Sequence, residues 1–241
     1  MDNSKAIFLA GSDRGIFGNE FFRIQSVMSN GMPGTGRPEN FGPLVVFNDD
    51  IVSPEGFLGL HPHQNIEVIA IVLEGSEFQK DDKGAEAELT ADDVQLISSG
   101  TGIRHSAGNP SAVKFARNLQ IWIEPREKNT APNIQTKTAS VNAKKNEWML
   151  QISPDGREES LIVLQDAWLS KGRFDAKTKP EYNLFSPGNG VMVYLIDGKI
   201  EVNGIVLESH DTALFFETEK LLFHIIEDAH IQLIETDPKR G

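Results

Sequence analysis

The sequence predicts an all-β protein in which one chain carries two similar β units. Short runs rich in Val, Ile, Leu and Phe recur between Gly, Asp, Asn and Pro, a pattern typical of strands joined by turns. No helix-length stretch keeps an apolar period of about 3.6 residues. Two segments in the second half of the chain also repeat the pattern of two segments in the first. Such a chain is expected to form sandwiches or barrels.

The predicted strands follow one another at short spacing. Most are continuous apolar runs, and the longest contains Asn203-Gly204, which suits a two-residue type I′ hairpin turn. In order, the runs cover residues 42–50, 67–75, 92–100, 116–125, 147–153, 160–170, 190–207, 212–218, 221–228 and 230–236.

The internal repeat joins two pairs of segments. "IAIVLEGSEF" (69–78) resembles "MVYLIDGKIEV" (192–202), since each has an apolar strand, an acid, Gly and then an alternating strand. "LTADDVQLI" (89–97) resembles "LESHDTALF" (207–215), with Leu, Asp and Leu at the same spacing. The alternative is a chance likeness between hairpins. The repeat predicts two units of about 120 residues each.

A polar segment, residues 124–147, separates the two units. It is poor in large apolar residues and is interpreted as a linker or an extended exchange segment. We therefore expect a boundary near residue 138, with one domain at 1–137 and a second at 138–241.

Composition excludes several functional classes. The net charge of -12 disfavours binding to nucleic acid, whose phosphates are negative. The chain has no cysteine, so disulfides, thiolate nucleophiles and cysteine-ligated metal sites are excluded. No run approaches the roughly 20 apolar residues that span a membrane, and the first residues do not resemble a signal peptide. We expect a cytoplasmic protein without a membrane partner.

His61 and His63 lie one residue apart at the start of an apolar run. Side chains at i and i+2 of a strand share a face, so both imidazoles are expected to point the same way. Pro62 between them cannot donate a ladder hydrogen bond, which favours an edge strand or a strand start. Two neutral imidazoles make half of a metal site. The alternative is a pair of surface histidines.

His105 supplies a third imidazole in the same unit, after a turn marked by Gly100 and Gly102. Two ligands from one strand and one from its neighbour could meet at the mouth of a small barrel. We therefore predict a metal site at His61, His63 and His105. The histidines of the second unit are isolated and are interpreted as structural or surface residues, namely His210, His224 and His230.

The blocks "HPHQNIEVIAIVLEG", "SSGTGIRHSAGNPS" and "NLQIWIEP", in this order, resemble the pirin family, in particular its bacterial pirin-like quercetin 2,3-dioxygenase branch. The resemblance implies a bicupin, meaning two double-stranded β-helix (jelly-roll) barrels in one chain. It implies one divalent metal ion in the N-terminal barrel, usually Fe(II), with Zn, Mn, Ni or Cu as alternatives. The C-terminal barrel is expected to have lost its ligands.

One position departs from the family pattern. The family's fourth ligand is a glutamate in "HSE", and this chain has "HSA", with Ala107 at that place. Glu67 fits the H-x-H-x3-4-E pattern of other cupins, although on a straight strand it would lie ~13 Å from His63. A turn at Gln64-Asn65 could bring it back. Glu67 is thus a candidate ligand and catalytic base, or a carboxylate that orients a histidine; otherwise water fills the fourth position.

The resemblance implies a metal-dependent dioxygenase that acts on a flavonol-like aromatic substrate. The alternative is a non-enzymatic metal or redox sensor that regulates a protein partner, and a site with little metal is a third reading. Aerobic turnover of quercetin separates the first reading from the others.

Overall fold

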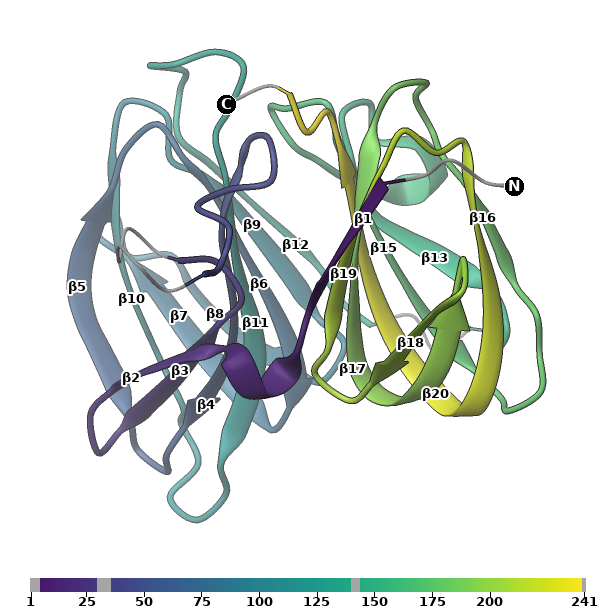
Figure 1. The fold of residues 1–241 in the computed structure, drawn as a ribbon. Coiled ribbons are helices and arrows are strands. Elements are labelled where there is room, and N and C mark those ends of the chain that lie inside the picture. Colours follow the sequence, from purple (N-terminus) through teal and green to yellow (C-terminus); the bar gives the residue numbers. More distant parts are fainter. Residues whose placement is uncertain (1–4, 30–35, 140–143, 240–241) are drawn as a thin grey trace.

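The computed structural model describes residues 5–29, 36–139 and 144–239, and Figure 1 shows that they form two β-barrels side by side. The prediction of an all-β bicupin is confirmed. The helical turns of the described residues are two short 3-10 segments, η1 (Gly11–Asp13) and η2 (Arg157–Glu159). None of the helices described is long and apolar enough to cross a membrane.

The first barrel consists of a seven-stranded sheet facing a four-stranded sheet. The larger sheet has the order β12-β9-β6-β11-β4-β3-β2, and the smaller has the order β5-β10-β7-β8. Their bounds are β2 (Gly15–Gly18), β3 (Phe22–Ser26), β4 (Leu44–Val52), β5 (Phe57–His63), β6 (Glu67–Glu74), β7 (Ser76–Asp81), β8 (Glu86–Thr90), β9 (Val94–Ser98), β10 (Ile103–Gly108), β11 (Ala116–Ile123) and β12 (Asn133–Lys137).

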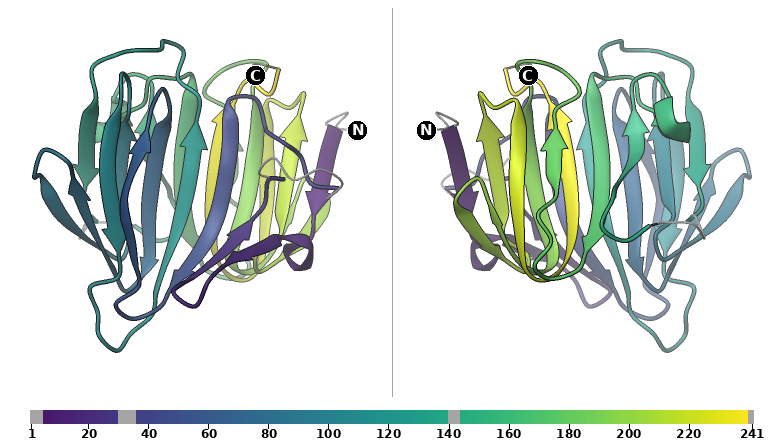
Figure 2. Two further views of the ribbon diagram at one scale, coloured as in Figure 1. Left: turned by 90° about the vertical axis from the view of Figure 1, so that its left-hand side faces the viewer. Right: turned by 90° about the vertical axis from the view of Figure 1, so that its right-hand side faces the viewer.

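The second barrel is a nine-stranded sheet that curls on itself. Its main path is β1-β19-β17-β20-β15-β13-β14, with β16 paired to β20 and β18 paired to β17. Figure 2 shows the molecule from the side of each barrel, and within each barrel the strands lie next to one another. The bounds are β1 (Lys5–Leu9), β13 (Trp148–Ser153), β14 (Leu161–Ile162), β15 (Ala167–Phe174), β16 (Glu181–Asn183), β17 (Gly190–Val202), β18 (Ile205–Glu208), β19 (Thr212–Phe216) and β20 (Lys220–Thr236).

The internal repeat is visible in the backbone angles. Gly75 and Gly198, which match in the sequence repeat, both adopt a positive φ, of 74° and 105°. Asp92 and His210 also match, and their φ values are 74° and 76°. Positive φ is uncommon outside glycine, so its recurrence at matched positions shows that the two units turn the chain in the same way.

The two barrels pack through their large sheets. One continuous apolar cluster draws side chains from both, with Phe47 and Ile69 from the first barrel and Met192 and Tyr194 from the second. Along β11, alternate side chains enter this cluster, namely Leu119, Ile121 and Ile123. The large sheet of the first barrel is therefore covered on both faces, by the barrel interior and by the second barrel.

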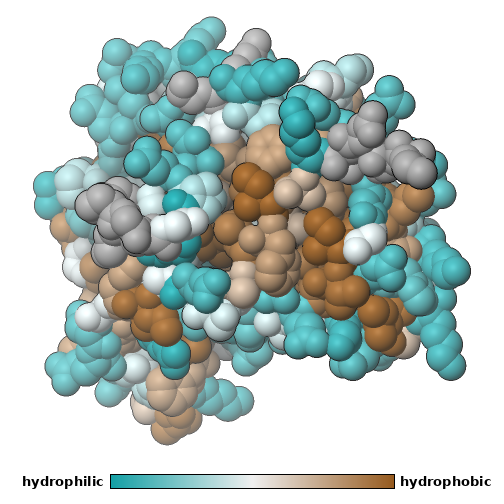
Figure 3. Space-filling model, in the orientation of Figure 1, coloured by the Kyte–Doolittle hydropathy of each residue, from teal (hydrophilic) through white to brown (hydrophobic). Residues whose placement is uncertain are grey.

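The first strand departs from the expected division into residues 1–137 and 138–241. β1 crosses to the second barrel and pairs with β19 along Lys5–Leu9, as Figure 1 shows. It leaves Ile7 and Phe8 about half exposed, and Figure 3 shows hydrophobic surface in this part of the face. β12, from the expected linker, pairs with β9 in the first barrel, whereas β13 lies in the second. The division itself stays a prediction.

Candidate metal centre

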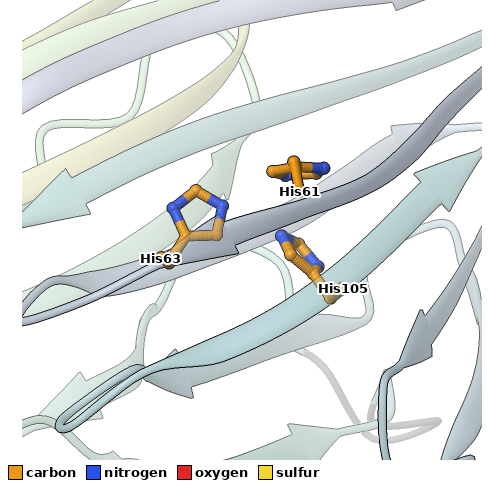
Figure 4. A group of neighbouring side chains, drawn as sticks. All are labelled: His61, His63 and His105. Atoms are coloured by element: carbon orange, nitrogen blue, oxygen red, sulfur yellow. The ribbon is translucent and has the colours of Figure 1, made fainter.

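Three histidines converge on one wall of the first barrel. His61 and His63 lie on the edge strand β5, and His105 lies on its neighbour β10, with His105 opposite His61 in the antiparallel register. Figure 4 shows the three rings gathered over these two strands. Each ring offers a nitrogen, and these nitrogens all lie within 4.8 Å of one another. Strand alternation brings the first two together, and strand pairing adds the third.

Hydrogen bonds set which ring nitrogen is free. Nδ1 of His61 donates to the carbonyl oxygen of Gly59 at 2.8 Å, and Nδ1 of His105 donates to Oε1 of Gln79 at 2.8 Å. Because both partners are acceptors, these rings carry their proton on Nδ1 and keep a lone pair on Nε2. The Nε2 atoms of His63 and His105 are buried without a hydrogen-bond partner in the described structure. This donor set fits a divalent metal.

Burial keeps two of the rings uncharged. Burial, together with repulsion from the neighbouring His61, lowers the pKa of His63 to about 4. Burial lowers the pKa of His105 to about 3, with added repulsion from His61 and His63. Both rings are neutral at neutral pH, which is the form that can coordinate a metal.

The histidines face a cavity of about 260 Å³ between the two sheets of the first barrel. This is near the lower end of the ~300–1,000 Å³ typical of small-molecule sites. Residues of β5 and of the β2–β3 hairpin both contribute to its lining. The lining residues used below are Asn48, Asp50, Leu58, His61, His63, Glu77, His105, Ala107, Asn118 and Trp122.

A buried chain of hydrogen bonds supports His105 from behind. Gln79 accepts the Nδ1 proton of His105, and its own amide donates to Glu77. Asn118 donates to the other carboxylate oxygen of Glu77. Glu77 is fully enclosed, and burial raises its pKa, while the donors Asn118 and Gln79 lower it. A carboxylate linked in this way fixes the orientation of a ligand histidine.

Ala107 lines the cavity on the same strand as His105. Its methyl group cannot coordinate a metal or accept a proton. The carboxylate expected from the family at this position is therefore missing from the cluster, and no other Asp or Glu among the described residues joins the three histidines within ligand distance.

The structure places Glu67, the expected replacement for this carboxylate, outside the three-histidine cluster. The predicted turn is present, since Asn65 adopts a φ of 53° between β5 and β6. However, Glu67 points away from the cavity: its carboxylate accepts from Ser98 Oγ at 2.8 Å and from the Leu164 amide of the second barrel at 3.2 Å. Side chains alternate along β6, so Val68 faces the barrel interior and Glu67 faces the other barrel.

Sequence reasoning missed Glu77, Gln79 and Asp50. Their positions carry a weak signal, because polar residues occupy every second position at Glu77 and Gln79 and at Asn48 and Asp50. Alternation of this kind is usually a sign of a solvent-exposed face. Here Glu77 and Asp50 line the cavity instead, while Phe47, on the opposite face of β4, packs in the apolar cluster shared with the second barrel.

The other histidines lie apart from this centre. His210 contacts the buried Asp49–Arg117 ion pair between the barrels, with Nδ1 3.6 Å from Asp49 Oδ2. His224 is exposed on β20. Burial, together with repulsion from Arg173, lowers the pKa of His230 to about 3. Within the described ranges, the cluster at His61, His63 and His105 is the only group of three that could share an ion.

Comparison with known proteins places the chain among its relatives. A family profile described as Pirin matches residues 25–123, and one described as Quercetinase C-terminal cupin domain matches residues 150–236. A quercetin 2,3-dioxygenase of Escherichia coli K12 is 31% identical over 82% of this chain and 84% of its own length. A pirin-like protein of Caulobacter vibrioides is 30% identical over 81% of this chain and 84% of its own.

Solved structures agree with the sequence matches. The crystal structure of YhhW from Escherichia coli has a TM-score of 0.90 and 26% identity, covering 98% of this chain and 100% of that one. A structure of bacterial pirin YhhW in complex with nickel(II) has a TM-score of 0.88 and 26% identity, with coverage of 96% and 99%. The paired barrels, the three histidines in the first barrel and these likenesses lead to one conclusion: the chain belongs to the pirin family.

Proposed function

We propose that His61, His63 and His105 bind one divalent metal ion and that the protein is a metal-dependent dioxygenase of flavonol-like aromatic compounds. The observation that carries the proposal is the convergence of three imidazoles, two with buried unpartnered Nε2 atoms, on a cavity of small-molecule size. Iron is the first candidate, with nickel, zinc, manganese and copper as alternatives. The relatives named quercetin 2,3-dioxygenase and the nickel complex of a bacterial pirin support it.

Residues around the three histidines have distinct roles at the metal site. A metal held by three histidines supplies Lewis-acid and redox chemistry to an oxygen-bearing ligand. Gly59 and Gln79 hold His61 and His105 in the tautomer that presents Nε2. Trp122 packs edge-on against His63, with ring centroids 5.1 Å apart, and lines the cavity beside it. The fourth protein position, Ala107, stays open to water or substrate.

The test is aerobic turnover of quercetin by metal-loaded protein, measured beside metal content. Wild type is expected to bind one ion per chain and to turn over slowly, because general-base help worth about 10²–10⁴ in rate is missing. Ala107→Glu restores the family motif and is expected to raise both metal occupancy and turnover. Glu67→Gln is the control and should change neither, since Glu67 faces the other barrel. Wild-type protein that binds no metal would contradict the proposal.

The second candidate function is a metal-dependent sensor that acts on a protein partner. The observation that favours it is Ala107, which leaves the cluster without the family's carboxylate. Metal that binds and cycles between oxidation states, with no quercetin turnover in wild type or in Ala107→Glu, would favour the sensor over the oxygenase.

A further inference from the structure

The cavity wall that faces the histidines carries polar side chains with unused hydrogen-bonding capacity. Asn48 and Asp50 lie on β4, and Asn118 lies on β11 directly opposite Asp50 in the antiparallel register. All three line the cavity. They belong to the seven-stranded sheet, whereas the histidines belong to the four-stranded sheet, so a ligand between the sheets would touch both groups.

Each of these side chains has an oxygen without a partner. Oδ1 of Asn48, Oδ1 of Asp50 and Oδ1 of Asn118 are buried and accept no hydrogen bond within the described structure. Asn48 and Asn118 are only 6% and 7% exposed. The amide of Asn118 donates to Glu77, so its free atom is necessarily the carbonyl oxygen. Buried polar atoms are nearly always hydrogen-bonded, so three free acceptors on one wall point to a ligand that brings donors.

The charge of the wall indicates whether it suits a ligand hydroxyl group or a cation. Burial raises the pKa of Asp50 to about 8, and repulsion from Asp49 and Glu77 contributes, while the backbone of Gln25 acts against it. At neutral pH this carboxyl is mostly protonated, and it presents a neutral donor and acceptor. A neutral wall can form hydrogen bonds with O–H groups, but it provides no negative charge to bind a metal cation.

We propose that Asn48, Asp50 and Asn118 bind hydroxyl groups of the aromatic substrate at the end remote from the three histidines. These three side chains then select a flavonol that carries further hydroxyl groups over a flavonol that carries only one. The inference rests on the proposed function for the end of the ligand that faces the histidines. The apolar side chains of Leu58 and Trp122 also line the cavity and suit a planar ring.

Binding without turnover tests the wall separately from the chemistry. Quercetin, which carries several hydroxyl groups, and 3-hydroxyflavone, which carries only the one nearest the reacting carbons, are titrated anaerobically into metal-free and nickel-loaded protein. The readout is the ratio of the two dissociation constants, followed by intrinsic fluorescence or calorimetry. Asp50→Leu removes an acceptor, Asp50→Asn keeps one, and Asp82→Leu makes the same change on an exposed turn outside the cavity.

Wild type and Asp82→Leu are expected to prefer quercetin by at least about ten-fold, since each net hydrogen bond adds several-fold to affinity. Asp50→Leu and Asn48→Leu should each lose most of that preference, and Asp50→Asn should retain it. Equal binding of the two flavonols by wild type, an unchanged ratio in both leucine variants, or no binding of quercetin to either protein form would overturn the inference. A retained ratio in protein that never turns over quercetin would instead overturn only the oxygenase function.

Discussion

The two barrels share a strand pattern but differ in what fills them. β11 of the first barrel pairs with β6 and β4, as β20 of the second pairs with β17 and β15. In the first barrel, Asn118 and Asp50 face each other across this pairing and line a cavity. In the second, Ile231 pairs with Gly172 and belongs to a large buried apolar cluster.

The two barrels have the same fold, but the interior of the second contributes to stability and the interior of the first holds a cavity. The second barrel's cluster includes Phe174, Tyr182 and Phe223, with Trp148 packed against it, and Gly172 leaves room for the rings of Phe174 and Trp148. Among the described residues, the small cluster inside the first barrel holds three buried members, Val68, Ile97 and Ile103. Apolar burial inside the second barrel therefore stabilises the molecule, while the first barrel keeps polar groups and space for a ligand.

The largest effect is expected from making the second barrel resemble the first. Ile231→Asn places an amide in the apolar interior at the position that corresponds to Asn118. Because Ile231 is fully buried, the free energy of unfolding should fall by about 4 kcal/mol. Chemical denaturation measures it, with Val206→Asn on the exposed side as the control. A loss no larger than that of the control would mean that both interiors tolerate polar groups equally.

The next largest effect is expected from removing a histidine, and this effect should differ between the two barrels. His105→Ala deletes one of three converging ligands and should weaken metal binding by about 100-fold or more, since even supporting residues contribute 10–100-fold. His230→Ala, in the second barrel, should leave it unchanged because that ring lies outside the cluster. Metal affinity is measured by competition with a chelator. Equal losses of metal affinity in His105→Ala and His230→Ala would contradict the expected difference between the two barrels.

The polar wall should make the first barrel's stability depend on pH. The pKa of Asp50 is raised from 3.8 to about 8. Its contribution to stability is fully present below the unfolded pKa and is lost as pH rises to about 8, because over this range the carboxyl ionises in the unfolded chain but stays protonated in the buried site. The stability advantage of Asp50→Asn over wild type should therefore increase by about 4 kcal/mol between about pH 5 and pH 9. Denaturation at both pH values checks this, with Asp82→Asn as the control. A gain that does not change with pH would show that Asp50 is not protonated.

The smallest effect concerns the hydrogen bonds behind His105. Gln79→Ala removes the acceptor for Nδ1 of His105 and should lower metal affinity by about ten-fold. Lys80→Ala, on the same strand but exposed, is the matched control and should leave metal affinity at the wild-type value. Chelator competition measures both. Unchanged affinity in Gln79→Ala would show that His105 needs no support from Glu77.

Strand alternation explains which parts of the site could be predicted. His61 and His63 share a face at any strand position, so their convergence follows from spacing alone. Glu67 fits a ligand pattern by its spacing, yet it faces Leu164 of the second barrel. Its side depends on which sheet lies against β6, and this information is not local.

The sequence by itself determined the all-β class, the two repeated units and the three-histidine pattern, because each depends on periodicity or spacing within a short segment. Only the tertiary structure decided which face of each strand lines the cavity. Both faces of the first barrel's large sheet are covered, so polar and apolar alternation could not distinguish inside from outside. The same reason hid Asp50, and the pairing of β1 with β19 joins segments far apart in the sequence, which no local pattern encodes.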